Sequence, residues 1–167
     1  MDNSERYVLG EKGNKPLIFI GLNPSTATSE KSDPTIKRIQ NYVTTQGYDG
    51  WLMLNLSPQR STYVDGLSMM IDNEIIERNL QFIEASIKEG SVICAVWGTS
   101  IETKAYLHES LLRILQLAEL KHCTWTCIKQ TMHGHPCHPL YRRKGFSLRT
   151  ENLKPFDINA YIQKLAC

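Results

Sequence analysis

Short apolar runs recur along this 167-residue chain and alternate with segments whose apolar residues follow a helical period. The first run, PLIFI, has a proline in front and a glycine behind it, and the third, SVICAVW, is rich in β-branched residues. Runs of this length and composition are typical of strands that are buried on both faces of a parallel sheet. The sequence therefore predicts four strands, at residues 16–20, 51–56, 91–97 and 122–128.

Helical patterns fill the segments between these runs. In SDPTIKRIQNYV, residues 32–43, the apolar residues share one face, Ser32 or Asp33 can cap the first turn, and Gly47 follows the end. Thr99 and Glu102 have the spacing of a capping box at the start of the third helix. The second and third helices are indicated by the stripes Ile76, Leu80, Ile83 and Ile87, and Leu107, Leu111, Ile114, Leu115 and Ala118.

The alternation of strands and helices predicts an α/β fold. Right-handed β-α-β crossovers place parallel strands in one sheet and cover both of its faces with helices. We therefore expect one α/β domain over residues 1–167 with a three-layer α/β/α architecture, in which helices cover both faces of a central, mainly parallel, four-stranded sheet. Residues 151–167 are expected to close it with a loop and a short helix.

Composition narrows the class of protein only slightly. No segment reaches the roughly 18 consecutive apolar residues that a membrane helix needs, and the start, MDNSERYVLGEKG, lacks the apolar stretch of a signal peptide. We therefore expect a cytoplasmic protein without a membrane partner. The five cysteines, Cys94, Cys123, Cys127, Cys137 and Cys167, are an odd number, so reduced thiols are expected rather than a disulfide framework.

Charge is distributed unevenly along the chain. Up to Leu120 there are 11 Lys and Arg against 15 Asp and Glu, which gives −4, whereas from Lys121 onward there are 8 against 2, which gives +6. A basic C-terminal third could face phosphates, or it could be an ordinary solvated surface.

Polar residues gather where the predicted strands end. The four strands lead into GLNPS, NLSPQR, WGTS and KQTMHGHPCHPLY. In open α/β sheets, ligands bind beyond the carboxyl ends of the strands, so these segments should share one edge. We expect a site there that collects Asn23, Asn55, Arg60, Thr99, His133, His135 and His138.

Several chemistries lack their motif in this sequence. No acidic pair lies at the strand ends, no G-x-S-x-G elbow is present, and neither nucleotide-binding glycine motif occurs. Cys123 and Cys127 are spaced C-x3-C within a predicted strand, where cysteines are more often small core residues than zinc ligands. We therefore expect no bound metal and no cofactor.

The asparagines indicate what the site binds. A carboxamide offers an acceptor beside a donor, which matches the Watson–Crick edge of a nucleobase or another amide. Asn23 could alternatively be a capping residue. Asn55 ends an otherwise apolar run, where a purely structural amide is harder to explain.

The motifs GLNPS, LMLN, VWG and HPCHPLYRRKGF, in this order, resemble those of the uracil-DNA glycosylase superfamily. GLNPSTA, DPT and GHPxHPLY are also similar to the signature of a family of small prokaryotic and phage proteins known only as a domain of unknown function. The first resemblance implies a uracil-DNA glycosylase-like fold and a site that binds a base flipped out of nucleic acid.

Residue roles follow from the glycosylase resemblance. It implies that Asn23 positions a water molecule, Asn55 reads the base edge and His135 stabilises the departing base anion, while Leu140 fills the vacated stack. Because the histidine loop is one residue longer here, His138 could replace His135. For base stacking, Tyr63 and Trp51 are the candidates. The other expected substrate contacts are Gly21, Pro24, Arg60, Trp97, Gly98 and His133, and the expected nucleic-acid contacts are the basic residues Arg142, Arg143 and Lys144.

Three functions remain open at the level of the sequence. The first is a domain that binds a nucleobase in nucleic acid and hydrolyses its N-glycosidic bond. The second is an enzyme that acts on a free nucleoside, nucleotide or modified base. The third is a non-catalytic module that binds nucleic acid or protein, since a fold does not determine a function. Nothing in the sequence indicates an oligomeric state.

Overall fold

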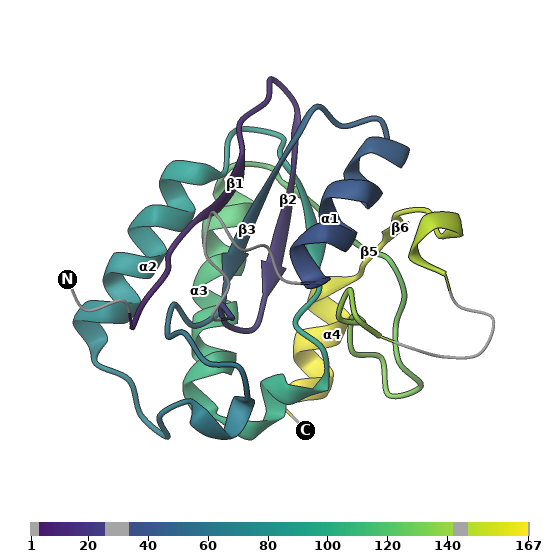
Figure 1. Cartoon of the computed structure of the whole chain (residues 1–167). Coiled ribbons are helices and arrows are strands. Elements are labelled where there is room, and N and C mark those ends of the chain that lie inside the picture. The colour runs from purple at the N-terminus through teal and green to yellow at the C-terminus, as the bar shows by residue number, and fades with distance from the viewer. Residues whose placement is uncertain (1–3, 26–33, 142–146, 167) are drawn as a thin grey trace.

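The computed structural model of the protein, which describes residues 4–25, 34–141 and 147–166, is built around a six-stranded mixed sheet (Figure 1). The strand order across the sheet is β1-β3-β2-β4-β5-β6. The four inner strands are parallel to one another, and both edge strands are antiparallel to their neighbours. The strands are β1 (Leu9–Glu11), β2 (Pro16–Gly21), β3 (Gly50–Asn55), β4 (Val92–Ala95), β5 (Thr124–Cys127) and β6 (Lys154–Pro155).

The prediction of a four-stranded sheet is therefore wrong in its number of strands. The four predicted runs correspond to the four inner strands, although β4 and β5 are each shorter than predicted. The edge strands were missed because LGE and KP are two or three residues long and mostly exposed, and so carry no apolar run. Very short, polar edge strands are a common way to protect a sheet from pairing with another chain.

Four α-helices accompany the sheet in the described part of the chain: α1 (Pro34–Thr45), α2 (Asn73–Ser86), α3 (Ala105–Leu120) and α4 (Ile158–Leu165). Three short 3₁₀ helices, η1 (Val64–Gly66), η2 (Thr99–Thr103) and η3 (Leu148–Thr150), lie between them. Gly47 follows α1 with a φ of 76°, a left-handed conformation that glycine adopts without strain. The short helix that was predicted within residues 151–167 is present as α4.

The predicted capping box of the third helix is wrong. Thr99 and Glu102 belong to η2, and α3 begins only after Lys104, which makes no side-chain cap. The separate turn arises at Gly98, whose φ of 73° redirects the chain before the helical stripe starts. The proposed caps of α1, Ser32 and Asp33, lie outside the described residues.

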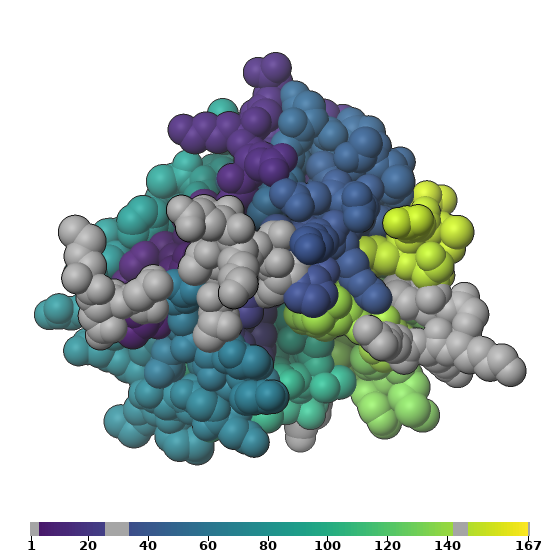
Figure 2. All heavy atoms as spheres, in the orientation of Figure 1, coloured from purple at the N-terminus to yellow at the C-terminus, as the bar shows by residue number. Residues whose placement is uncertain are grey.

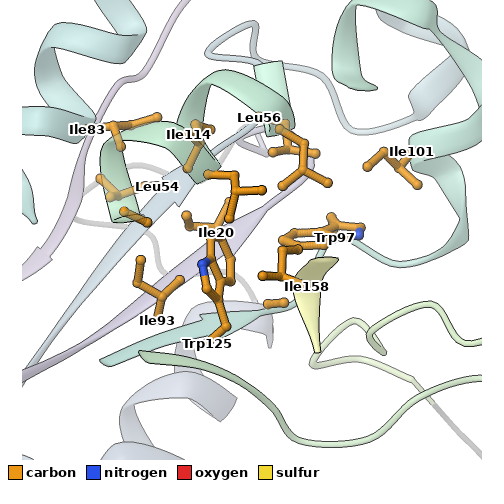
Figure 3. Close-up of a cluster of buried hydrophobic side chains, with 14 of the residues drawn as sticks. Ile20, Leu54, Leu56, Ile83, Ile93, Trp97, Ile101, Ile114, Trp125 and Ile158 are labelled. Atoms are coloured by element: carbon orange, nitrogen blue, oxygen red, sulfur yellow. The ribbon is translucent and has the colours of Figure 1, made fainter. Parts of the chain in front are cut away.

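Two apolar cores lie on opposite faces of the sheet because successive strand residues point to opposite sides. In β2, Leu17 and Phe19 pack towards α1, whereas Ile18 and Ile20 pack towards α2 and α3. Figure 3 shows the second core, in which Ile20, Leu54 and Ile93 of the sheet meet Ile83 of α2 and Ile114 of α3. Helices therefore cover both faces of the sheet.

Two expectations from composition can be compared with the fold. Cys94, Cys123, Cys127 and Cys137 are unpaired, as expected of reduced thiols, and Cys167 lies outside the described residues. Within the described ranges, no helix is both long enough and apolar enough to span a bilayer.

Candidate functional site

A cavity of about 550 Å³ opens at the carboxyl ends of the parallel strands. Its walls come from the ends of β2 and β3, the segment after β4, the first turn of α1 and the loop after β5. Figure 2 shows this face of the molecule, on which the beginning of α1 (blue), the loop after β3 (teal) and the segment after β5 (green) lie near one another. The volume is within the range of small-molecule sites, about 300–1,000 Å³.

Asn55 places a buried carboxamide in the wall of this cavity. The residue is only 3% exposed, and its side chain makes no hydrogen bond to any residue that the structure describes. Gly21 lies beside it in register on β2, and a Cβ at that position would come within 2.9 Å of the Asn55 amide oxygen. Because its amide opens onto the cavity, both the donor and the acceptor of Asn55 are accessible to a molecule that enters it.

Asn23 follows the end of the neighbouring strand β2, and the nitrogen of its side-chain amide is hydrogen-bonded. Its Nδ2 donates to the backbone oxygens of Ser61, at 2.9 Å, and Pro24, at 3.0 Å. These carbonyls settle which amide atom is nitrogen, since two oxygens would repel each other. The Oδ1 atom accepts no hydrogen bond from the described residues. Asn23 therefore offers the cavity an oriented acceptor rather than a donor.

His138 is the histidine that lines the cavity. Its Nδ1 accepts a hydrogen bond from the backbone N–H of Leu140 at 3.1 Å. In the neutral ring, the proton is therefore on Nε2, which makes that atom a donor. Leu140 and Tyr141 line the same wall.

His135 does not line the cavity, so the expectation that it does so together with Asn23 and Asn55 is corrected. It is 4% exposed, with Nδ1 2.9 Å from the Tyr161 hydroxyl and Nε2 3.1 Å from Glu102 Oε1. The chain reverses at Gly134, whose φ is 87°, and the His135 ring packs against Tyr161.

The other predicted substrate contacts divide into two groups. Gly21, Pro24 and Gly98 line the cavity, as do Asn55 and Leu140. Trp97 contributes to the wall, but its indole belongs to the core between the sheet and α3, where Nε1 donates to the Tyr161 hydroxyl at 3.0 Å (Figure 3).

Arg60 and His133 do not line the cavity. Arg60 Nε donates to the backbone oxygen of Ser25 at 3.3 Å, which ties the loop after β3 to the loop after β2. His133 is exposed in the turn after β5. Arg142, Arg143 and Lys144, the predicted nucleic-acid contacts, lie outside the described residues.

Among the wall residues that were not predicted, Arg6 and Tyr141 bring chemistry that the predicted set lacks. Arg6 precedes β1 and supplies a cation, and Tyr141 supplies an aromatic ring. The predicted stacking residues are elsewhere: Tyr63 is 76% exposed and Trp51 is 3% exposed within the core under α1. Tyr141 follows the HPL motif directly and could have been identified from that position, whereas nothing local marks Arg6.

Among the residues that the structure describes, no Asp or Glu lines the cavity. Cys137 also lines the cavity, and burial raises the pKa of its thiol, which keeps it protonated and poorly nucleophilic near neutral pH. Among the residues that the structure describes, no three His, Cys, Asp or Glu side chains cluster as metal ligands would. The polar groups of the described wall are amides, hydroxyls, an imidazole and the Arg6 guanidinium.

The model of one protein family, Protein of unknown function (DUF1643), matches residues 6–140. This match covers most of the chain, and the chain belongs to this family. Neither a curated protein nor a solved structure matches it.

Proposed function

We propose that this DUF1643-family domain binds a nucleobase in nucleic acid and hydrolyses its N-glycosidic bond, as a uracil-DNA glycosylase does. The observation that carries the proposal is the buried Asn55 carboxamide, which faces the cavity without a partner among the described residues. A nucleobase edge presents a donor beside an acceptor and would satisfy both ends of this amide at once. A base must leave its stack to reach such a pocket.

His138 supports the bond-breaking step. When the bond between the sugar C1′ and the base nitrogen breaks, the base leaves with the electron pair and becomes negatively charged. His138 is exposed at the cavity wall. Once a bound base excludes water, a donor such as its Nε2–H would stabilise this charge, and one such donor contributes about 10²–10³ in rate. The apolar part of the wall is provided by Ile36, Met53 and Val96.

Asn23 would complete the reaction by holding the nucleophilic water. Its Oδ1 can accept a hydrogen bond from the water, but a carboxamide cannot take up the proton. The water oxygen would bond to C1′ and the released proton would neutralise the departed base. The products would be the free base and a sugar that carries a hydroxyl at C1′. Without a carboxylate base in the described wall, the rate would depend on leaving-group stabilisation more than on water activation.

Arg6 supports a second candidate function, hydrolysis or modification of a free nucleotide. A guanidinium at the cavity could pair with the phosphate of a mononucleotide as well as with that of a nucleic-acid strand. In this version the same amide reads the base, and no extended nucleic-acid contact is needed.

Base release from defined substrates tests the proposal. Single- and double-stranded oligonucleotides that contain uracil, hypoxanthine or xanthine, and the matching free nucleosides and nucleotides, would be incubated with the protein and the freed base quantified by mass spectrometry. We expect release from an oligonucleotide, lost in Asn55→Ala and retained in Asn41→Ala, which removes an exposed amide on α1. Release from free nucleotides alone would favour the second candidate. Salt-dependent binding without release from any substrate would indicate a binding module and contradict both.

A further inference from the structure

A chain of hydrogen bonds runs behind the cavity from Trp97 to Glu102. Trp97 Nε1 lies 3.0 Å from the Tyr161 hydroxyl, this hydroxyl lies 2.9 Å from His135 Nδ1, and His135 Nε2 lies 3.1 Å from Glu102 Oε1. Trp97, Tyr161 and His135 are at most 4% exposed, whereas the Glu102 side chain is 61% exposed. The chain therefore begins in the core and ends at the surface.

The proton positions in this chain follow from its first member. An indole N–H can only donate, so the Tyr161 oxygen accepts from Trp97 and its own hydrogen remains for His135 Nδ1. The neutral His135 ring then carries its proton on Nε2, where it donates to Glu102. Burial raises the pKa of Tyr161 to about 12, so its hydroxyl stays protonated and able to donate at neutral pH. From Trp97 Nε1 to His135 Nε2, every polar side-chain atom of this chain has a partner.

His135 sits in a hairpin that leads directly to the cavity. The hairpin, residues 129–137, is closed by Cys137 N–H to the Lys129 carbonyl at 2.8 Å and by Thr131 N–H to the His135 carbonyl at 2.8 Å. Thr131 and Cys137 line the cavity, and His138 follows the hairpin immediately. A shift of the hairpin would therefore move His138.

Building on the proposed function, we propose that His135 is a positioning residue, which anchors the 129–137 hairpin to Tyr161 and Glu102 and so fixes His138 in the cavity. The anchor joins three separate parts of the chain, because Glu102 lies in η2 and Tyr161 in α4. Gly98 N–H adds a backbone bond to the Pro136 carbonyl at 2.9 Å, beside the same histidine.

A merely space-filling role for His135 is less consistent with its contacts. An apolar side chain of similar size would fill the space, yet both ring nitrogens are occupied by side chains from other elements. Tyr161 and Glu102 do not line the cavity. Their substitution therefore tests the anchor without removing a group that could touch the substrate.

Hydrogen–deuterium exchange of the hairpin amides tests the anchor independently of catalysis. In Tyr161→Phe, the His135 and Trp97 nitrogens lose their shared partner, and we expect exchange within residues 129–137 to become about tenfold faster or more. Tyr106→Phe is the matched control, because it removes a partly buried hydroxyl that bonds Ser57, away from the cavity. Exchange in the hairpin that is no faster in Tyr161→Phe than in Tyr106→Phe would overturn the proposal.

Kinetics on the base-releasing substrate provide the second measurement. Tyr161→Phe should lower kcat about tenfold, and Glu102→Ala should lower it by a smaller factor. KM should stay nearly unchanged in both variants, because His138 acts on the departing base and not on substrate binding. Glu102→Gln keeps an acceptor oxygen and should recover most of the loss, and Glu77→Ala, which removes a surface partner of Arg113, should have no effect. The Tyr161→Phe, Glu102→Ala double variant should be less impaired than the product of the single effects.

The outcomes separate the anchor from the proposed function. If no substrate releases a base but Tyr161→Phe accelerates hairpin exchange, the anchor stands and the glycosylase proposal fails. If His135→Ala abolishes kcat while Tyr161→Phe and Glu102→Ala behave like their controls, His135 acts directly on the substrate and the positioning role is overturned.

Discussion

Two groups of buried polar side chains near the carboxyl ends of the strands differ in their hydrogen bonding. On the side of α4, Trp97, Tyr161 and His135 are connected by hydrogen bonds that end at Glu102. On the cavity side, Asn55 is as deeply buried, yet its carboxamide makes no hydrogen bond to a described residue. The first arrangement is complete within the chain, whereas the second requires something from outside it.

Unpaired buried atoms such as Asn79 Oδ1 and Trp125 Nε1 also occur away from the cavity, so the feature that points to a ligand for Asn55 is that its amide opens onto the cavity. A histidine is the more familiar catalytic residue, but the buried His135 has both ring nitrogens occupied by the chain itself. An unpaired buried amide is costly, and such groups in folded proteins call for an explanation. The proposed function therefore gives ligand recognition to Asn55 and the anion-facing role to His138, which lines the cavity.

The largest expected effect is on the cavity side, in His138→Ala. Loss of the Nε2–H donor should lower kcat for base release by about 10²–10³, with little change in substrate affinity, because the charge on the base develops only as the bond breaks. Single-turnover kinetics and a binding titration separate these two quantities. An equal loss in His133→Ala, which changes an exposed histidine outside the cavity, would contradict this assignment.

A smaller loss of activity is expected from Gly21→Ala. The added Cβ would lie 2.9 Å from Asn55 Oδ1, and the amide, as the free end of a side chain, would turn away rather than unfold the strand. Substrate affinity should fall about tenfold while the free energy of unfolding changes by less than about 1 kcal/mol. In an Asn55→Ala background, Gly21→Ala should cause no further loss of affinity. A further loss in that background would show that Gly21 affects binding by a route other than the Asn55 amide.

Substitutions in the two groups should affect the free energy of unfolding in the opposite order to their effects on activity. Tyr161→Phe leaves two buried nitrogens without their partner and should cost about 1–3 kcal/mol. Asn55→Leu replaces an unpaired buried amide by an apolar group of similar size, so it should be nearly neutral or stabilising while base binding is lost. Urea unfolding of the two variants provides the comparison. A greater loss of stability in Asn55→Leu would mean that the amide has a structural role.

The elements that were predicted correctly carry their signal locally. Each inner strand is an apolar run and α1, α2 and α3 each bury one stripe, so the order of elements and the shared edge followed from the pattern. Strands β1 and β6 have no such run, and their position depends on pairing with β3 and β5. The η2 turn was mistaken for a helix start because the spacing of Thr99 and Glu102 does not reveal the positive φ of Gly98.

The site was predictable to the level of its motifs but not of its individual side chains. Asn23, Asn55 and His138 follow strand ends, and the parallel inner strands bring these ends to one edge. Whether His135 or His138 faces the cavity depends on the direction in which a hairpin turns its side chains. Arg6 comes to the cavity through backbone pairing of its N–H with the Pro58 carbonyl, a contact between segments 52 positions apart that no local pattern encodes.

A last expected effect is a pH dependence that belongs to the paired group alone. Burial raises the pKa of Tyr161 to about 12, against about 10 in the unfolded chain. The contribution of the protonated hydroxyl is therefore complete below pH 10 and is lost as the pH rises towards 12, because the unfolded state releases its proton first. A difference of this size corresponds to about 2.7 kcal/mol at full deprotonation.

The difference in unfolding free energy between the wild type and Tyr161→Phe should therefore be constant from pH 7 to 9 and shrink by about 2 kcal/mol by pH 12, as measured by urea unfolding. In Asn55→Leu, which removes no ionisable group, the corresponding difference should stay constant over the same range. A constant difference for Tyr161→Phe would mean that the hydroxyl is not held protonated by burial, and the chain from Trp97 to Glu102 would then lack the donor on which its direction depends.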